Sequence, residues 1–186
     1  MLAEKITISK YKILTKYSKL DEKVKTIIEK LYGIEEFNKE YQLSSNLNIK
    51  AFKIDKIFLY NIKSNNELKK YENKTGVYIF LKDNIPVYIG FSGKEDKGQS
   101  LYGRIVNKQL STNDTLVTNI KDIETLLNPN LPLLEDRKKL ILDYTSSLIV
   151  IDCGKKELDN VKFAQALEVI LIALFNSKYN KWKKIF

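Results

Sequence analysis

Residues 75–90 of this 186-residue chain read TGVYIFLKDNIPVYIG, and this segment predicts a β-hairpin. Its two halves are rich in β-branched and aromatic residues, which favour strands, and the polar Lys82-Asp83-Asn84 between them suits a turn. A three-residue loop would pair Tyr78 with Tyr88, whereas a two-residue loop would pair Tyr78 with Ile89. The first register sets two phenols side by side. The alternative is a pair of half-buried strand tyrosines that only pack.

Helices and strands are expected on both sides of this hairpin. Downstream, the pattern predicts a helix from Ser100 to about Leu110, a helical region broken at Asn128-Pro129-Asn130, a buried strand at Ser147–Asp152, and a helix that Asp159 caps and that ends near Asn176–Asn180. Upstream, it predicts a strand-like or irregular segment at Lys5–Leu14, helices at Asp21–Gly33 and Glu35–Gln42, and a strand at Ile54–Ile62.

Glu168 is the one charged residue in the apolar stretch Phe163–Phe175. A stretch that is apolar all round predicts a helix buried on every side. An ionised carboxylate in such a helix is costly unless it is neutralised, paired or bound to a metal ion. A metal site, a buried Lys or Arg partner, and a narrow solvent gap are therefore the alternatives for Glu168.

The composition narrows the class of protein. There are 32 basic and 23 acidic residues, a formal charge of +9, which favours a polyanionic partner or simply solubility. The single cysteine, Cys153, excludes an internal disulfide and fits a reducing cytoplasm, where we expect the protein to be located. The N-terminus lacks an apolar signal core. Phe163–Phe175 is shorter than the roughly 20 apolar residues that span a bilayer, so no membrane association is expected.

The chain contains no histidine. This excludes serine–histidine and cysteine–histidine hydrolases, zinc sites with histidine ligands, and nucleases with a histidine base. A P-loop is also excluded, because Gly93-Lys94 lacks both the upstream glycine and the following Ser or Thr. Any acid–base chemistry must use carboxylate, tyrosine, lysine or metal-bound water.

Arg104 and Lys108 are four residues apart in a predicted helix and should share one face. Gly103 before them costs about 1 kcal/mol relative to alanine inside a helix, and it lets a bulky group approach the backbone. This face is either a binding surface for an anion or an ordinary solvated basic face.

Five elements in order resemble the GIY-YIG nuclease family: Gly76-Val77-Tyr78, Tyr88-Ile89-Gly90, Arg104, Glu168 and Asn180. The first tripeptide is a conservative variant and the second is identical. The resemblance covers about Thr75 to Lys181. It implies an α+β fold, with a small core of a three-stranded antiparallel sheet flanked by helices over residues 75–186. A helical insert at 109–146 and an N-terminal annex of helix and strand at 1–74 would complete the chain.

The resemblance also implies a role for each matching residue. Tyr78 would be the general base or its relay, Tyr88 would position water or phosphate, and Arg104 would contact the scissile phosphate. Glu168 would be the only protein carboxylate on a divalent cation, Mg²⁺ or alternatively Mn²⁺. Asn180 would support the site.

Two further expectations concern the surroundings of these residues. Gly90 would leave room for the phosphate backbone. Lys108 stands where many family members carry histidine, and it would lower a tyrosine pKa or bind phosphate, or be an ordinary DNA contact. Arg104, Lys108 and the metal ion together are expected to lower the tyrosine pKa from its usual value of about 10.

The predicted function is a divalent-metal-dependent endonuclease that hydrolyses double-stranded DNA at a preferred sequence, of a restriction or mobile-element (phage) type. The alternatives are a non-catalytic DNA-binding protein on the same fold and a core that serves only protein interaction. Residues 1–74 would recognise DNA or mediate dimerisation, and the insert would add sequence preference. A monomer would nick, whereas a symmetric homodimer would cut both strands. The expected DNA contacts are Lys94, Lys97, Lys108, Lys178, Lys181, Lys183 and Lys184.

Overall fold

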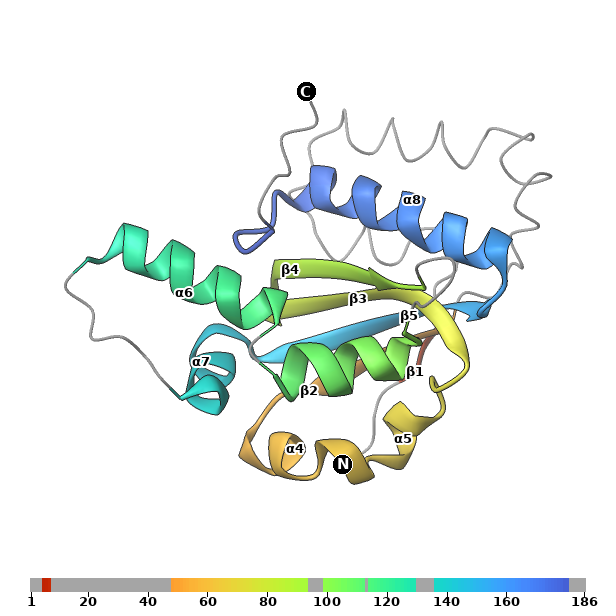
Figure 1. Cartoon of the computed structure of the whole chain (residues 1–186), viewed down its shortest axis with the longest axis horizontal. Helices are drawn as coiled ribbons and strands as arrows, with labels where there is room; N and C mark the ends of the chain where they lie inside the picture. Colours follow the sequence, from red (N-terminus) through yellow and green to blue (C-terminus); the bar gives the residue numbers. More distant parts are fainter. Residues whose placement is uncertain (1–4, 8–47, 94–98, 113, 130–135, 181–186) are drawn as a thin grey trace.

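A five-stranded antiparallel sheet forms the centre of the computed structural model, which describes residues 5–7, 48–93, 99–112, 114–129 and 136–180. The strand order is β1-β2-β5-β3-β4. The strands are β1 (Lys5–Thr7), β2 (Asn48–Lys53), β3 (Lys74–Lys82), β4 (Ile85–Ser92) and β5 (Ser147–Lys155). The three expected core strands β4, β3 and β5 are adjacent in the sheet, and β4 forms one edge (Figure 1). The predicted α+β class, with an antiparallel sheet flanked by helices, is confirmed.

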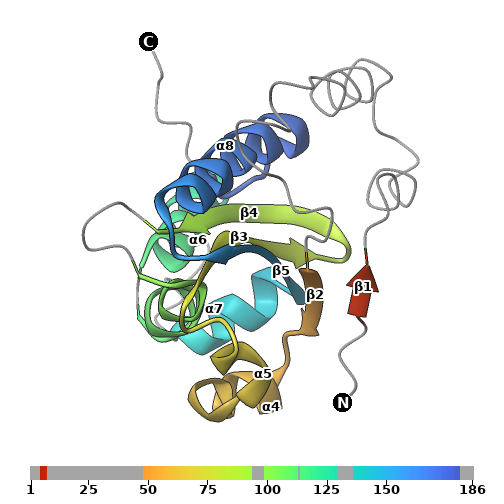
Figure 2. The same cartoon turned by 90° about the vertical axis from the view of Figure 1, so that its right-hand side faces the viewer.

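Helices cover both faces of the sheet (Figure 2). The long helix α8 (Leu158–Phe175) lies along one face. The opposite face carries α4 (Lys56–Tyr60), the 3₁₀ turn η1 (Ile62–Ser64), α5 (Asn66–Lys69), the π-helix η2 (Gly103–Leu110), α6 (Thr115–Leu127) and α7 (Arg137–Tyr144). The helical break predicted at residues 128–130 separates α6 from the segment that precedes α7, and that prediction is confirmed.

Strand β3 contributes to two hydrophobic cores. Tyr78 and Phe80 point toward η2, α6 and α7, whereas Val77 and Ile79 point toward α8. This follows from the strand geometry, because successive side chains project to opposite faces of a sheet. The first of these two cores contains the residues that the sequence singled out as functional.

The hairpin turn contains two residues. Lys82 pairs with Ile85, so the loop is Asp83-Asn84, and φ is 51° at Asp83 and 67° at Asn84. Positive φ at both central residues is the type I′ geometry, which matches the right-handed twist of the flanking strands. Asparagine and aspartate tolerate this region better than other non-glycine residues. The prediction of a three-residue loop is therefore wrong.

A β-bulge then shifts the register of the hairpin. Leu81 pairs with Pro86, but Phe80 pairs with Tyr88, which leaves Val87 as the additional residue. A bulge at this point suits Pro86, which has no backbone N–H for the ladder. The consequence is that Tyr78 lies opposite Gly90. Both predicted partners of Tyr78, which were Tyr88 and Ile89, are wrong.

The strand predicted at Ile54–Ile62 is also wrong, because most of it is helical. Asp55 is the N-cap of α4, and its Oδ1 accepts a hydrogen bond of 2.8 Å from the Phe58 backbone N–H. Such a cap satisfies one of the unpaired N–H groups at a helix start. The strand in this region is β2, which precedes that segment.

Helix α8 is buried on one side only. Phe163 and Ala164 are buried, but Val169 is 53% exposed. The prediction of a helix buried on every side is therefore wrong, because the sheet covers only one face of α8. The helix begins at Leu158 with Glu157 as its N-cap, two residues before the predicted cap Asp159. It ends at Asn176 in a left-handed conformation, as expected for a C-terminal cap.

The described part of residues 1–74 joins the same sheet, because β2 pairs with β5 along its whole length. The helices predicted at Asp21–Gly33 and Glu35–Gln42 lie outside the described residues. Within the described ranges, no helix is long and apolar enough to cross a membrane.

Candidate active site

Tyr78 and Tyr88 lie on the same face of the hairpin as diagonal neighbours. Their ring centroids are 6.3 Å apart and the rings are inclined by 35°. Phe80, directly opposite Tyr88, contacts the Tyr78 ring edge-on at 6.0 Å. Tyr78 is 0% exposed and Tyr88 is 5% exposed. The two phenols are therefore diagonal neighbours and not the direct pair that the three-residue loop predicted, and they lie deeper in the core than half-buried strand tyrosines.

Gly90 leaves room for the Tyr78 ring. A Cβ atom at Gly90 would lie 2.5 Å from Cζ and 2.9 Å from Cε2 of Tyr78. Real Cβ atoms do not approach other atoms this closely in a packed interior. We expected the missing side chain of Gly90 to make room for a phosphate backbone. In the structure, the Tyr78 ring occupies this space.

The π-helix η2 brings Arg104 and Gln109 to Tyr78. Gln109 Nε2 donates a hydrogen bond of 3.1 Å to the Tyr78 hydroxyl oxygen, and the positive charge of Arg104 also acts on this phenol. Hydrogen bonds in a π-helix join residues five apart, which is the spacing of these two residues. Lys108, expected on the face of Arg104, is exposed.

Ser100 begins this helical segment, as predicted. Its Oγ accepts a hydrogen bond of 3.2 Å from the Gly103 backbone N–H, and its carbonyl accepts one of 2.9 Å from the Arg104 N–H. Two of the unpaired N–H groups at the helix start are thereby satisfied. This cap fixes where the helical segment that leads into η2 begins, and so where Arg104 enters the site.

The sequence analysis did not identify Gln109. This residue is 0% exposed, and its Oε1 accepts a hydrogen bond of 2.9 Å from the Leu116 backbone N–H. The one sequence feature that could have identified Gln109 is its spacing of five residues from Arg104. In an α-helix, residues three or four apart lie on the same face instead.

Burial dominates the ionisation of both phenols. It raises the pKa of Tyr78 above its ordinary value, while Arg104 and the hydrogen bond from Gln109 act in the opposite direction. Burial likewise raises the pKa of Tyr88, and the neighbouring Tyr78 adds to the rise. A neighbouring cation was expected to lower the tyrosine pKa. Arg104 does act in that direction, but burial outweighs it, so the pKa of both phenols rises. Both phenols are neutral at neutral pH.

The pKa of the Arg104 side chain depends on groups from three elements. Burial lowers the pKa of its guanidinium, but Tyr78, Asp114 and Tyr88 together raise that pKa above its ordinary value. Its Nη1 lies 3.8 Å from Oδ2 of Asp114, the N-cap residue of α6. The Arg104 side chain is 31% exposed. Arg104 is therefore charged and reachable from solvent.

The charge of Glu168, on α8, acts on both phenols. It adds to the raised pKa of Tyr78 and of Tyr88 as the smallest of the named causes, after burial as the largest. Glu168 is half-buried rather than fully buried. Across the described part of the chain, no group of three or more Asp, Glu or Cys side chains gathers as a metal site. A single carboxylate still fits Mg²⁺, which keeps several waters and often binds through one or two carboxylates.

Asn180 supports the site through the backbone of β4. Its Oδ1 accepts a hydrogen bond of 2.8 Å from the Ile89 N–H, and its Nδ2 donates one of 2.7 Å to the Ile89 carbonyl. Ser177 Oγ donates a further bond of 2.6 Å to Oδ1. Since β4 is an edge strand, these bonds satisfy backbone groups that otherwise face no neighbouring strand. They hold the residue between Tyr88 and Gly90.

The predicted DNA-contacting lysines are only partly described. Lys108 and Lys178 are exposed, and Lys178 Nζ pairs with Glu124 Oε1 at 2.5 Å. Five further lysines lie outside the described residues: Lys94, Lys97, Lys181, Lys183 and Lys184.

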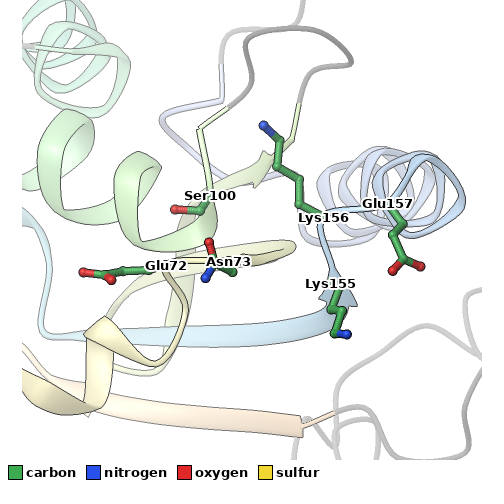
Figure 3. Close-up of a pocket in the computed structure, with 6 residues that line it drawn as sticks. All are labelled: Glu72, Asn73, Ser100, Lys155, Lys156 and Glu157. Carbon is green, nitrogen blue, oxygen red and sulfur yellow. The ribbon is translucent and has the colours of Figure 1, made fainter.

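A pocket of about 560 Å³ lies away from the phenols. Its lining residues are Glu72, Asn73, Ser100, Lys155, Lys156 and Glu157. Figure 3 shows that the charged side chains diverge instead of pointing toward a common centre. No residue of the predicted site lines this pocket, so the pocket does not identify the candidate active site.

Similarity to known proteins is found among solved structures. No protein-family model and no curated protein matches the sequence. Among solved structures, the chain is similar to the GIY-YIG N-terminal endonuclease domain of UvrC from Thermotoga maritima bound to its catalytic divalent cation, magnesium. The identity is 22%, the TM-score is 0.34, and the match covers 62% of this chain and 98% of that one.

A point mutant of the same domain, bound to its catalytic divalent cation, matches with 22% identity and a TM-score of 0.34, over 62% of this chain and 97% of that one. The family of that domain is the one whose motifs the sequence resembles. A likeness at this level assigns no activity to this chain.

Proposed function

We propose that this chain is a GIY-YIG nuclease that hydrolyses phosphodiester bonds in double-stranded DNA with the help of a divalent metal ion. One observation carries the proposal: the charges of Arg104 and Glu168 both act on the buried, adjacent phenols Tyr78 and Tyr88. These residues come from separate elements of the fold. A cation, a carboxylate and two hydroxyl groups in one site would supply the groups that phosphoryl transfer requires.

Arg104 would bind the scissile phosphate. In the free protein its guanidinium pairs with Asp114 at 3.8 Å, and a phosphate would compete with this carboxylate for the same donors. The positive charge would then stabilise the extra negative charge of the pentavalent transition state. Glu168 would hold the metal ion, Mg²⁺ or Mn²⁺, which when bound would polarise the phosphate and stabilise the leaving oxygen.

The phenols would handle the proton of the attacking water. As the water oxygen bonds to phosphorus and the bond to the leaving oxygen breaks, that water must lose a proton. A phenol with a raised pKa is a neutral group, so it takes a proton only while it passes its own hydroxyl hydrogen on. That hydrogen would pass to solvent water, and the leaving oxygen would take a proton from solvent in turn. Of the two roles expected for Tyr78, the neutral state favours the relay. Tyr88 would orient the water or the phosphate.

The biological setting belongs to the same proposal. We infer a cytoplasmic enzyme of the restriction or mobile-element type, with residues 1–74 and the insert at 109–146 contributing DNA recognition. A homodimer would cut both strands, and a monomer would nick.

A non-catalytic DNA-binding protein is the second candidate. One observation favours it: the Tyr78 side chain is 0% exposed, so its hydroxyl meets no substrate until a neighbouring side chain moves. The two candidates differ in whether bound DNA is cut.

The deciding experiment incubates purified protein with supercoiled plasmid and Mg²⁺, and then maps the ends. We expect nicked or linear plasmid from the wild-type protein and intact plasmid from Glu168→Gln, which keeps the side-chain shape but loses the charge. The matched control is Glu157→Gln, an exposed carboxylate before the start of the same helix, and it should cut normally. Intact plasmid with the wild-type protein, at concentrations that bind DNA, would favour the binding protein. Normal cutting by Glu168→Gln would refute the metal-ligand role.

A further inference from the structure

We propose that Gln109 is a positioning residue that makes the Tyr78 oxygen an acceptor toward the protein, and so directs the Tyr78 hydroxyl hydrogen away from both Gln109 and Arg104. The hydrogen bonds of Gln109 with Tyr78 and Leu116 stand on the contacts alone. Its consequence for cleavage rests on the proposed nuclease function.

The orientation of the Gln109 amide is set by a backbone group. The Leu116 N–H can only donate, and it lies 2.9 Å from Oε1 of Gln109. The reversed amide would place its NH₂ against this N–H and leave both without an acceptor. The oxygen therefore faces Leu116, and the NH₂ faces the Tyr78 hydroxyl at 3.1 Å.

The second neighbour of the phenol oxygen is also a donor. A guanidinium has N–H groups and no acceptor, so the Tyr78 hydroxyl cannot donate to Arg104, whose charge acts on this phenol. A neutral phenol has one hydrogen to donate besides its acceptor capacity. With Gln109 donating and Arg104 unable to accept, that hydrogen must point in a third direction. A relay would need this hydrogen free to leave, and the lone pair that Gln109 does not use free to accept the proton of the attacking water.

Both donors are fixed by the first turn of α6. Leu116 holds Gln109 through its backbone N–H, and Asp114 pairs with Arg104 at 3.8 Å. Thr115, between them, donates a hydrogen bond of 3.0 Å from its hydroxyl to Oδ1 of Asp114. The N-terminal turn of α6, inside the insert at residues 109–146, thus reaches both Gln109 and Arg104. We infer that this part of the insert organises the active site.

Burial makes the arrangement rigid. Gln109 is 0% exposed and its amide is bonded at both ends. A buried side chain that loses either partner leaves an unsatisfied polar group. Alternative rotamers of Gln109 are therefore disfavoured, and the Tyr78 oxygen keeps its donor.

Two substitutions test this inference. Gln109→Glu keeps the shape and the acceptor for Leu116, but an ionised carboxylate cannot donate, so the Tyr78 hydroxyl should turn and donate to it. Gln109→Met has a similar length and removes the donor without adding a charge. The control is Gln165→Glu on the exposed side of α8. The fold of each variant is checked by circular dichroism.

The first readout is the tyrosine Raman doublet of the protein without DNA, whose intensity ratio is higher for a phenol oxygen that accepts than for a hydroxyl that donates. We expect the ratio to fall in both Gln109 variants and to stay constant in Gln165→Glu. The difference should vanish when the same substitutions are made in the Tyr78→Phe background. An unchanged ratio in both variants, or a difference that persists in that background, would overturn the inference.

The second readout is single-turnover cleavage of plasmid. We expect Gln109→Glu to cleave about 10- to 100-fold more slowly than the wild-type protein, the scale on which a misplaced reacting group loses rate, with DNA affinity maintained. A wild-type protein that does not cleave would refute the proposed function, while the Raman result would still decide the role of Gln109. Equal cleavage by wild-type protein and both folded variants would overturn the positioning role.

Discussion

The ring of Tyr78 fills the space that a side chain on Gly90 would occupy, and the two residues are partners across the β3–β4 ladder. The first tyrosine and the last glycine of the two tripeptides therefore depend on each other. We predict that Gly90→Ala destabilises the fold by about 1–3 kcal/mol, the usual cost of overpacking a core. Urea unfolding measures this. In a Tyr78→Leu background, which lacks the ring, the same substitution should cost clearly less. Equal costs in both backgrounds would refute the dependence.

The pair of hydrogen bonds between Asn180 and Ile89 should be important for stability and activity. We predict that Asn180→Ala lowers the free energy of unfolding by about 1–3 kcal/mol, because backbone groups of β4 lose their partners. Cleavage should also slow, since Ile89 lies between Tyr88 and Gly90. Asn66→Ala, an exposed asparagine in α5, is the control and should have little effect on either property. If Asn180→Ala loses no more stability and activity than Asn66→Ala, Asn180 is dispensable.

The hydroxyl of Tyr78 should matter more than that of Tyr88. We predict that Tyr78→Phe lowers single-turnover cleavage by at least about 10²-fold, the low end for loss of a positioned acid–base group. Tyr88→Phe should cost less, because that residue is expected only to orient. Tyr60→Phe is the control, since Tyr60 is 82% exposed on α4. Normal turnover in both test variants would reduce the buried tyrosines to packing residues.

Arg104 and Lys108 should separate catalysis from binding. We predict that Arg104→Ala lowers single-turnover cleavage in Mg²⁺ far more than it weakens DNA binding in Ca²⁺, because the charge acts on the transition state. Lys108→Ala should do the reverse, since Lys108 is exposed. A salt titration of binding should then lose about 0.9 from its log–log slope for one phosphate contact. An Arg104→Ala variant that loses only affinity would favour the DNA-binding protein.

Alkaline pH should destabilise the protein through Tyr71. Burial, with a further contribution from Asp152, raises the pKa of this phenol to about 12 from an ordinary 10.0. A raised pKa in the folded state means that folding favours the neutral phenol. This stabilisation is complete below pH 10 and is lost as pH rises from about 10 toward 12. We predict a falling urea midpoint across this range, with a smaller fall in Tyr71→Phe. The fall in Tyr60→Phe should match that of the wild-type protein, and an unchanged fall in Tyr71→Phe would refute the prediction.

Local features of the sequence predicted most elements near the site. The alternation of residues 75–90 predicted the hairpin, Ser100 predicted the helix start, and Asn128-Pro129-Asn130 predicted the end of α6. Each of these depends on a backbone preference or a cap within a few residues, so neighbours in the sequence are sufficient. The strand wrongly expected at Ile54–Ile62 shows the limit of periodicity, since Asp55 and its cap favour a helix in a short apolar run.

Other properties depended on contacts between distant residues. The bulge at Val87 changed the partner of Tyr78, and the π-helix brought Gln109 to its hydroxyl instead of Lys108. The exposure of Glu168 depended on how much of α8 the sheet covers. None of these follows from spacing along the chain.

By itself the sequence determined the kinds of residue at the candidate site: two tyrosines, an arginine and a glutamate in a chain without histidine. Those residue types limit the available acid–base chemistry, because each side chain has its own donors, acceptors and charge. Only the tertiary structure decided the ionisation and orientation of the phenols. Burial raises the pKa of Tyr78, and Gln109, 31 residues away along the chain, donates to its oxygen. Desolvation and hydrogen bonding depend on neighbours in space, and folding alone brings those neighbours together.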